Sequence, residues 1–131
     1  MDSSPRMGGT GARRVLVIED DDAIRALIHE VLADDGYDVH EARTGNEGLQ
    51  RAGEVRPDVI LLDKLMPDGD GTSFAQQYLA RNGSHAPIVA LSAAADASDW
   101  ASRIGASAYL AKPLAIEDLL SVVRTALEKA R

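Results

Sequence analysis

Short apolar runs alternate with helical segments along the chain, and this alternation restricts its fold more than any other feature. Three runs, at residues 15–18, 59–62 and 88–91, are rich in β-branched residues and bounded by polar or turn residues. Such runs are typical of parallel strands that are covered on both faces of a sheet. Two further segments, 37–41 and 108–111, are less apolar. Their composition suits strands at the two edges of the same sheet.

Between the predicted strands, apolar residues recur at the three- and four-residue spacing of amphipathic helices. Asp21 or Asp22 is the expected N-cap of the first helix. Five strands alternating with five flanking helices predict an α/β fold with a doubly wound, five-stranded parallel sheet. With the less apolar strands at the edges, the strand order is 2-1-3-4-5, which is the flavodoxin-like arrangement. The predicted helices cover residues 24–32, 45–53, 74–79, 98–104 and 116–127.

Length and composition narrow the choice of protein class. The 131 residues suit one domain, and the Ser, Pro and Gly near the start predict a disordered tail at 1–12 before a domain at 13–131. The net charge of −7, without a basic stripe, disfavours direct binding to nucleic acid. The chain has no cysteine, which excludes disulfides and thiolate metal sites, and no apolar run long enough for a membrane helix. Because no secretory signal is recognisable, a cytoplasmic location is the default expectation.

Three carboxylates follow neighbouring strands of the predicted sheet. Glu19 and Asp20 end the first strand, and Asp63 ends the third. Ligands of such sheets bind at this edge, where the direction of the strand order reverses. Two like charges 4 Å apart repel by about 4 kcal/mol at an effective dielectric constant near 20, and a divalent cation removes that repulsion. The three acids therefore predict a magnesium site, although any one of them alone would be read as a solvated turn residue.

A hydroxyl and a cation are expected at the same edge. Ser92 ends the fourth predicted strand, and Lys112 follows the fifth. Taken alone, they would be an ordinary loop serine and a surface lysine. Facing a metal-bound carboxylate, they form a site for a tetrahedral anion. This combination predicts in-line attack by Asp63 on a phosphoryl donor.

Four segments of the sequence, each at the carboxyl end of a predicted strand, carry a resemblance to a known family. They resemble the receiver domain of two-component response regulators, within the chemotaxis-regulator-like superfamily, over about residues 14–129. Each segment alone is a modest signal, but four in the correct order are specific. The segments are VLVIEDD at 15–21, DKLMPDGDG at 63–71, ALSA at 90–93 and GASAYLAKP at 105–113.

The resemblance implies a phosphoacceptor and a metal site. Asp63 matches the family's phosphoacceptor, which takes a phosphoryl group from the phosphohistidine of a kinase or from a small acyl phosphate. Asp20 matches a direct ligand of Mg²⁺, with Mn²⁺ as a substitute, and Glu19 acts there directly or through a bound water. The backbone carbonyl of Leu65 matches a further ligand of the metal.

The resemblance also implies a conformational switch. Lys112 contacts a phosphoryl oxygen in this family, and its bond to Pro113 is expected to be cis. Ser92 and Tyr109 match the switch pair: the hydroxyl moves toward the phosphoryl group, and the tyrosine ring fills the space that it leaves. The surface of the fourth helix, fifth strand and fifth helix changes with them and serves output.

The implied partners are a sensor histidine kinase or phosphotransfer protein and a downstream output domain or protein. Dimerisation on phosphorylation is a further expectation from the family. A receiver is a signalling module that catalyses only its own phosphorylation and dephosphorylation. Neither nucleic acid nor a membrane is expected as a direct partner of this domain.

Two alternatives remain open from the residues alone. A magnesium-dependent phosphohydrolase with an aspartyl-phosphate intermediate would need a general acid two residues after its nucleophile, where this chain has Leu65. A degenerate receiver that serves only as a scaffold would lack site residues, and none is missing. Leu65 and Ala94 cannot hydrogen-bond an attacking water. In this family their positions tune hydrolysis, so we expect a long-lived phosphoryl state.

Overall fold

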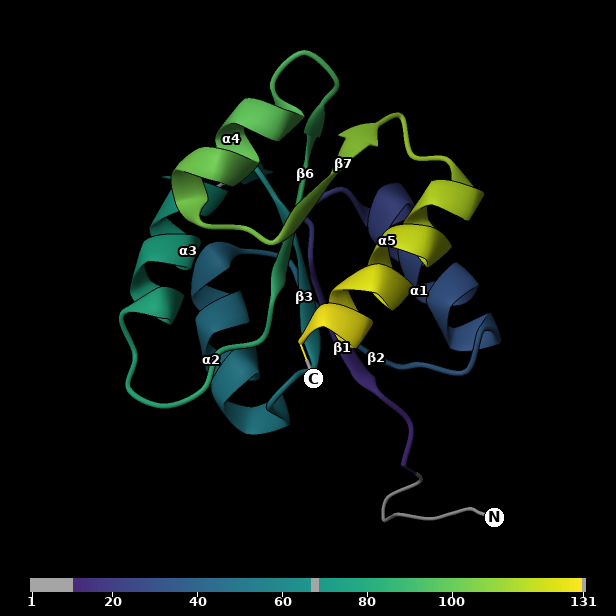
Figure 1. Cartoon of the computed structure of the whole chain (residues 1–131), viewed down its shortest axis with the longest axis horizontal. Coiled ribbons are helices and arrows are strands. Elements are labelled where there is room, and N and C mark those ends of the chain that lie inside the picture. Colours follow the sequence, from purple (N-terminus) through teal and green to yellow (C-terminus); the bar gives the residue numbers. More distant parts are fainter. Residues whose placement is uncertain (1–10, 67–68, 131) are drawn as a thin grey trace.

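The computed structural model describes residues 11–66 and 69–130, and its centre is a five-stranded parallel sheet (Figure 1). The strand order is β2-β1-β3-β6-β7, which is the predicted order 2-1-3-4-5 under the labels of Figure 1. Residues 1–10 of the predicted tail lie outside the described residues. The five strands are β1 Arg14–Ile18, β2 Asp38–Ala42, β3 Val59–Asp63, β6 Ile88–Ala93 and β7 Ala108–Lys112.

Helices cover both faces of this sheet. Helices α1 and α5 lie on one face, and α2, α3 and α4 lie on the other (Figure 1). The Asp21 side chain caps α1 by accepting from Ile24 N, and the Thr44 side chain caps α2 by accepting from Glu47 N. No helix among the described residues combines the length and apolar character needed to span a bilayer. The helices are α1 Asp22–Asp34, α2 Gly45–Val55, α3 Gly71–Leu79, α4 Ala97–Ile104 and α5 Ile116–Lys129.

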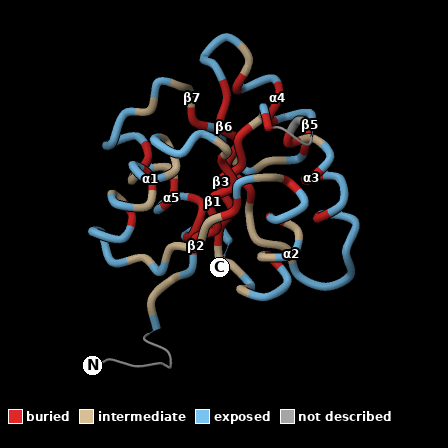
Figure 2. Tube along the Cα trace, turned by 180° about the vertical axis from the view of Figure 1, so that it is seen from behind, coloured by how far each residue is buried: buried red, intermediate tan, exposed pale blue. Residues whose placement is uncertain are grey.

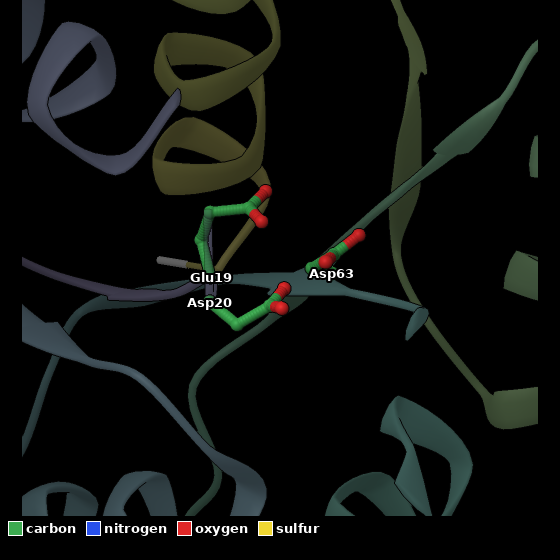
Figure 3. Close-up of side chains that lie close together, drawn as sticks. All are labelled: Glu19, Asp20 and Asp63. Atoms are coloured by element: carbon green, nitrogen blue, oxygen red, sulfur yellow. The ribbon is translucent and has the colours of Figure 1, made fainter. Parts of the chain in front are cut away.

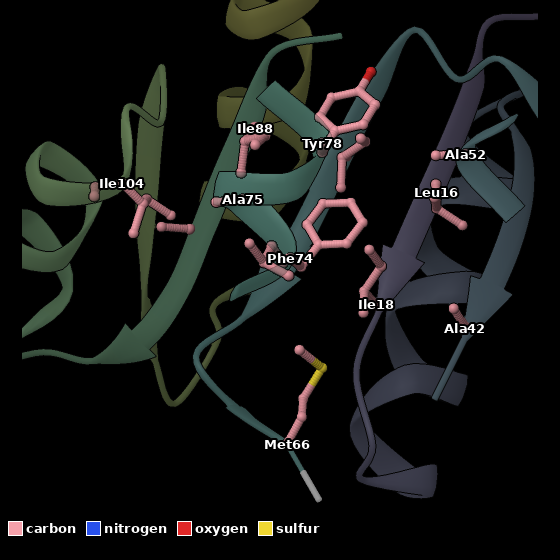
Figure 4. Close-up of a cluster of buried hydrophobic side chains, with 14 of the residues drawn as sticks. Leu16, Ile18, Ala42, Ala52, Met66, Phe74, Ala75, Tyr78, Ile88 and Ile104 are labelled. Atoms are coloured by element: carbon pink, nitrogen blue, oxygen red, sulfur yellow. The ribbon is translucent and has the colours of Figure 1, made fainter. Parts of the chain in front are cut away.

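The central strands are buried on both faces because their side chains alternate between two apolar cores (Figure 2). Leu16 and Ile18 of β1 face the core beneath α2, α3 and α4, whereas Val15 and Val17 face the core beneath α1 and α5. The first core surrounds the stacked rings of Phe74 and Tyr78 (Figure 4). This double coverage explains why these strands are continuous apolar runs in the sequence.

A short hairpin follows β3. Strand β4, Leu65–Met66, pairs antiparallel with β5, Gly69–Asp70. Gly69 has φ +116°, a conformation that glycine adopts without strain. At Gly71 a Cβ atom would lie 2.6 Å from the carbonyl oxygen of Asp63. The backbone therefore approaches the end of β3 closely at Gly71, where only glycine fits without a shift.

Candidate functional site

The three predicted carboxylates meet at one end of the sheet (Figure 3). Glu19 and Asp20 follow β1, and Asp63 is the last residue of β3. These strands are paired neighbours, so the ends of both place their side chains in one small volume. One carboxylate oxygen from each residue lies within 4.8 Å of the others. The convergence expected from the strand order is thus present.

Lys112, the last residue of β7, reaches across to these acids. Its Nζ lies 2.9 Å from Asp63 Oδ1 and 3.0 Å from Glu19 Oε1. Glu19 is fully buried, and Asp63 is only 4% exposed. Two buried carboxylates are therefore held together by one ammonium group. The peptide bond from Lys112 to Pro113 is cis, as expected.

Burial and charge shift the protonation of this group. Burial, and then the nearby charge of Asp63, raise the pKa of Glu19 to about 7, even though Lys112 opposes the shift. Burial of the ammonium opposes its charge, but the hydrogen bond to Asp63 and the ion pair with Glu19 raise the pKa of Lys112 above its usual range. The site thus keeps Lys112 as a cation, while Glu19 gains or loses a proton close to neutral pH.

The donor atoms at this site fit a small, hard divalent cation. All are carboxylate oxygens, which Mg²⁺ and Mn²⁺ prefer. Glu19 Oε1 is buried and receives no hydrogen bond. Its contact with Lys112 is an ion pair that does not have hydrogen-bond geometry. An acceptor left in this state has capacity for a cation or for a water bound to it. The role of the Leu65 carbonyl as a ligand stays a prediction.

The guanidinium group of Arg25 holds the backbone just after β1, at the residue that carries the Glu19 carboxylate. Arg25 Nη1 of α1 donates to the carbonyl oxygen of Glu19 at 2.9 Å. The same side chain pairs with Glu41 at 3.2 Å and with Asp22 at 2.6 Å. Because Arg25 ties α1 and β2 to the residue that carries the buried carboxylate, it positions Glu19. Nothing in the sequence pointed to this role except that an arginine lies on a predicted helix.

Ser92 hydrogen-bonds to an aspartate at the start of α4, and its predicted contact with a phosphoryl group stays a prediction. Its hydroxyl donates to Asp96 Oδ2 at 3.2 Å. The ammonium of Lys64, the residue after Asp63, donates to the same oxygen. Sequence reasoning missed both Lys64 and Asp96, because their meeting depends on where α4 begins relative to the end of β3. The only available signal was an aspartate just before a predicted helix.

An open hollow of about 720 Å³ joins these groups at the sheet edge. The predicted site residues that line it are Glu19, Asp20, Asp63, Leu65, Ser92 and Lys112. Tyr109 is absent from this lining and is 49% exposed on the edge strand β7. In the register of β6 and β7, Ala90 pairs with Tyr109 and Ser92 pairs with Ala111. Tyr109 is therefore the diagonal neighbour of Ser92 on the face beneath α4.

Known proteins match this chain in both sequence and fold. A family model described as the response regulator receiver domain matches residues 15–124. The KDP operon transcriptional regulatory protein KdpE of Escherichia coli is 40% identical over 117 residues, which are 88% of this chain and 51% of that protein. Response regulator MprA of Mycolicibacterium vanbaalenii is 37% identical over 118 residues, with coverage of 88% and 51%.

The comparisons differ in how much of the related protein this chain covers. The chain spans about half the length of the curated relatives that it matches. Among solved structures, the chemotaxis response regulator CheY4 of Vibrio cholerae has a TM-score of 0.81 and 30% identity. That match covers 88% of this chain and 99% of the solved chain.

Proposed function

The chain belongs to the response regulator receiver domain family, and on this premise we propose that Asp63 accepts a phosphoryl group. The donor is the phosphohistidine of a sensor kinase or of a phosphotransfer protein. One observation carries the proposal: the Asp63 carboxylate ends β3 within an open hollow, bonded to Lys112 and flanked by Glu19 and Asp20. Receiver domains are signalling modules, so the phosphorylated chain is itself the product.

The chemical step is an in-line displacement at phosphorus. A carboxylate oxygen of Asp63 forms the new P–O bond, while the P–N bond breaks and leaves its electron pair on the imidazole. With an acyl phosphate, the P–O bond to the acyl group breaks instead. Lys112, already bonded to Asp63 Oδ1, is placed to transfer its hydrogen bond to a phosphoryl oxygen. It would stabilise the charge that the transferred group carries.

Glu19, Asp20 and Asp63, together with the Leu65 carbonyl, would hold the metal ion, Mg²⁺ or in its place Mn²⁺. When bound, the cation neutralises charge on the carboxylates and on the phosphoryl oxygens. Arg25 orients the chain's own part of this site by fixing the backbone of Glu19. Burial, and then the charge of Asp63, raise the pKa of Glu19 to about 7, so a bound cation would favour the charged carboxylate at this position.

The switch follows from the positions of Ser92 and Tyr109. We infer that phosphorylation draws the Ser92 hydroxyl from Asp96 toward the phosphoryl group. The exposed Tyr109 ring, the diagonal neighbour of Ser92 on the face beneath α4, then turns into the space that is freed. The surface formed by α4, β7 and α5 changes with it. That surface is where we propose that an output domain or protein reads the signal.

A phosphohydrolase is the enzyme alternative, and the residue two positions after Asp63 argues against it. This residue is Leu65, whose side chain is 72% exposed and carries no group that transfers a proton. The leaving group of a hydrolytic cycle would therefore lack an acid there. We accordingly propose that catalysis is limited to the chain's own phosphorylation and dephosphorylation.

The decisive experiment is intact-mass spectrometry after incubation with acetyl phosphate and Mg²⁺. We expect one phosphoryl adduct that requires the metal, is removed by hydroxylamine and is absent from Asp63→Ala. Asp99→Ala is the matched control, because Asp99 is an exposed aspartate on α4 outside the hollow. An adduct on Asp63→Ala, or none on the wild type despite bound Mg²⁺, would contradict the proposed acceptor.

Three further parts of the proposal concern the whole molecule. We propose that residues 13–131 form the receiver and that 1–12 form a tail. Phosphorylation is proposed to favour a homodimer, and neither nucleic acid nor a membrane is a direct partner of this domain. Sedimentation velocity before and after phosphorylation tests the dimer, and an unchanged profile would count against it.

A further inference from the structure

Asp96 stands at the N-cap of α4, but its side chain makes no capping hydrogen bond. An aspartate at this position ordinarily accepts from a backbone N–H of the first helical turn. Asp21 and Thr44 do so for α1 and α2. The Asp96 carboxylate is therefore turned to other partners, and these lie at the candidate site.

Two of its partners come from segments that border Asp63. The Ser92 hydroxyl donates to Asp96 Oδ2 at 3.2 Å, and the Lys64 ammonium pairs with the same oxygen. Ser92 is the switch hydroxyl of the proposed function, and Lys64 immediately follows the proposed phosphoacceptor. One carboxylate oxygen thus holds a hydrogen-bond donor and a cation that both line the hollow around Asp63.

A hydroxyl has one proton to donate, so Ser92 cannot donate to Asp96 and to a phosphoryl oxygen at once. Phosphorylation of Asp63 would add negative charge and acceptor oxygens in the hollow that these side chains line. We propose that Asp96 is a positioning residue that holds Ser92 and Lys64 in the unphosphorylated chain and competes with the phosphoryl group for both. This inference rests on the proposed phosphorylation of Asp63.

The surroundings of Asp96 allow it both to hold and to release these groups. The hydrogen bond from Lys64 is the first cause that lowers the pKa of Asp96, so the carboxylate stays charged at neutral pH. Its side chain is 34% exposed, and ion pairs that water reaches are weak enough to exchange. Arg103 lies 3.7 Å from Asp96 Oδ1. A released Asp96 therefore keeps a cationic partner on its own helix.

The chain carries its own reporter of this contact. Trp100 is the single tryptophan, and the Lys64 ammonium lies 6.0 Å from the centre of its ring. The buried indole is fixed by a 2.9 Å hydrogen bond from Nε1 to the Thr72 hydroxyl. A cation that leaves the ring changes the electric field at the indole. Trp100 fluorescence should therefore respond when Lys64 leaves Asp96.

The test is a titration with beryllium trifluoride, a tetrahedral mimic of the phosphoryl group, in the presence of Mg²⁺ and followed by Trp100 fluorescence. We expect Asp96→Asn to bind the mimic about five- to tenfold more tightly than the wild type, at the low end of coupling between sites because Asp96 is partly exposed. Without the mimic, its fluorescence should already be shifted toward that of the bound wild type. Asp99→Asn removes an equal charge from α4, pairs with Arg103 but not with Ser92, and should behave like the wild type.

A double-mutant cycle separates release of Ser92 from a general loss of negative charge. In a Ser92→Ala background, the gain from Asp96→Asn should shrink to about twofold or less. A gain that persists undiminished there, or one that Asp99→Asn reproduces, would overturn the proposal. So would an Asp96→Asn variant that matches the wild type in both affinity and fluorescence while the wild type binds the mimic. A wild type that does not bind the mimic through Asp63 would instead refute the proposed function, and this inference with it.

Discussion

Lys112 and Lys64 lie on two sides of Asp63, and each holds a carboxylate, but their surroundings differ. Lys112 bridges Asp63 and the fully buried Glu19. Lys64 pairs with Asp96, whose side chain is one-third exposed. The buried set cannot lose its cation without leaving unpaired charge in the protein interior, whereas the exposed pair has water and Arg103 as substitutes.

This difference separates two tasks within one site. The buried set around Lys112 holds the Glu19 and Asp63 carboxylates together, and we propose that it keeps them in a fixed arrangement for metal binding and phosphoryl transfer. The pair of Lys64 and Asp96, whose side chains are 24% and 34% exposed, is the part that we propose to rearrange when charge is added at Asp63. The predictions below test whether the two lysines are separated in this way.

The largest expected effect is the loss of stability when Lys112 is removed. Lys112→Met leaves Glu19 and Asp63 without a cation, and breaking a buried pair costs about 3 kcal/mol of unfolding free energy. Lys64→Met should change stability far less, because Asp96 remains solvated. Urea denaturation at pH 8 without divalent cations measures both. Equal losses in the two variants would remove the distinction, and Mg²⁺ should restore part of the loss in Lys112→Met.

The next effect concerns pH. Because the pKa of Glu19 is raised to about 7, protons compete with the metal below that pH, and the Mg²⁺ dissociation constant should rise about tenfold from pH 8 to pH 6. The hydrogen bond from Lys64 lowers the pKa of Asp96, so Asp96 stays charged throughout this range. Trp100 fluorescence of the metal-free protein should accordingly stay constant. Isothermal titration calorimetry at several pH values tests the first expectation.

Glu19→Gln is the control for this pH dependence. It should bind Mg²⁺ more weakly than the wild type at pH 8 and with little change down to pH 6. A wild-type affinity that is flat over this range would show that Glu19 is not the competing group. If Trp100 fluorescence without metal followed the same pH dependence, protonation of Glu19 would be coupled to the Lys64–Asp96 pair, and the two lysines would not be separated.

The smallest effect concerns the uncharged neighbour of Asp63, the exposed Leu65 of β4. Leu65→Asn introduces an amide that can hydrogen-bond an attacking water, and one such bond corresponds to about three- to tenfold in rate. Phosphoryl loss, followed by intact mass after removal of the donor, should accelerate by this factor. Leu27→Asn is the matched control, because Leu27 is an exposed leucine on α1 outside the hollow. Slower decay in Leu65→Asn would contradict the expectation of a long-lived wild-type phosphoryl state.

The strands and helices were predictable because the burial of their side chains is visible as apolar patterns in the sequence. Val15 to Ile18 form a continuous apolar run since alternate side chains enter different cores. The N-cap of α1 was narrowed to Asp21 or Asp22 for a similar local reason, and it is Asp21. The convergence of Glu19, Asp20 and Asp63 followed from the strand order alone, since parallel neighbours end at one edge.

The hairpin and the exposed pair could not be predicted in this way. Strands of two residues, such as Leu65–Met66, are too short to show a periodic pattern. The pairing of Lys64 with Asp96 joins positions 32 residues apart and depends on rotamers and on the start of α4. Asp96 was also indistinguishable from an ordinary helix cap. Local patterns report backbone structure and burial, but they carry little information on which polar groups meet between loops.

Gly71 determines how motion at Asp63 can spread. Its N–H donates to the carbonyl oxygen of Lys64 at 2.5 Å, which closes the β4–β5 hairpin into a ring, and its missing side chain leaves the Asp63 carbonyl in direct contact. A Cβ at this position would also lie 2.9 Å from the Trp100 ring. The first turn of α3 therefore packs against both the Asp63 backbone and Trp100 of α4 with no room for a side chain between them. Any side chain at this position would have to displace the end of β3 or the indole on α4, so a single glycine keeps three elements in register at the site.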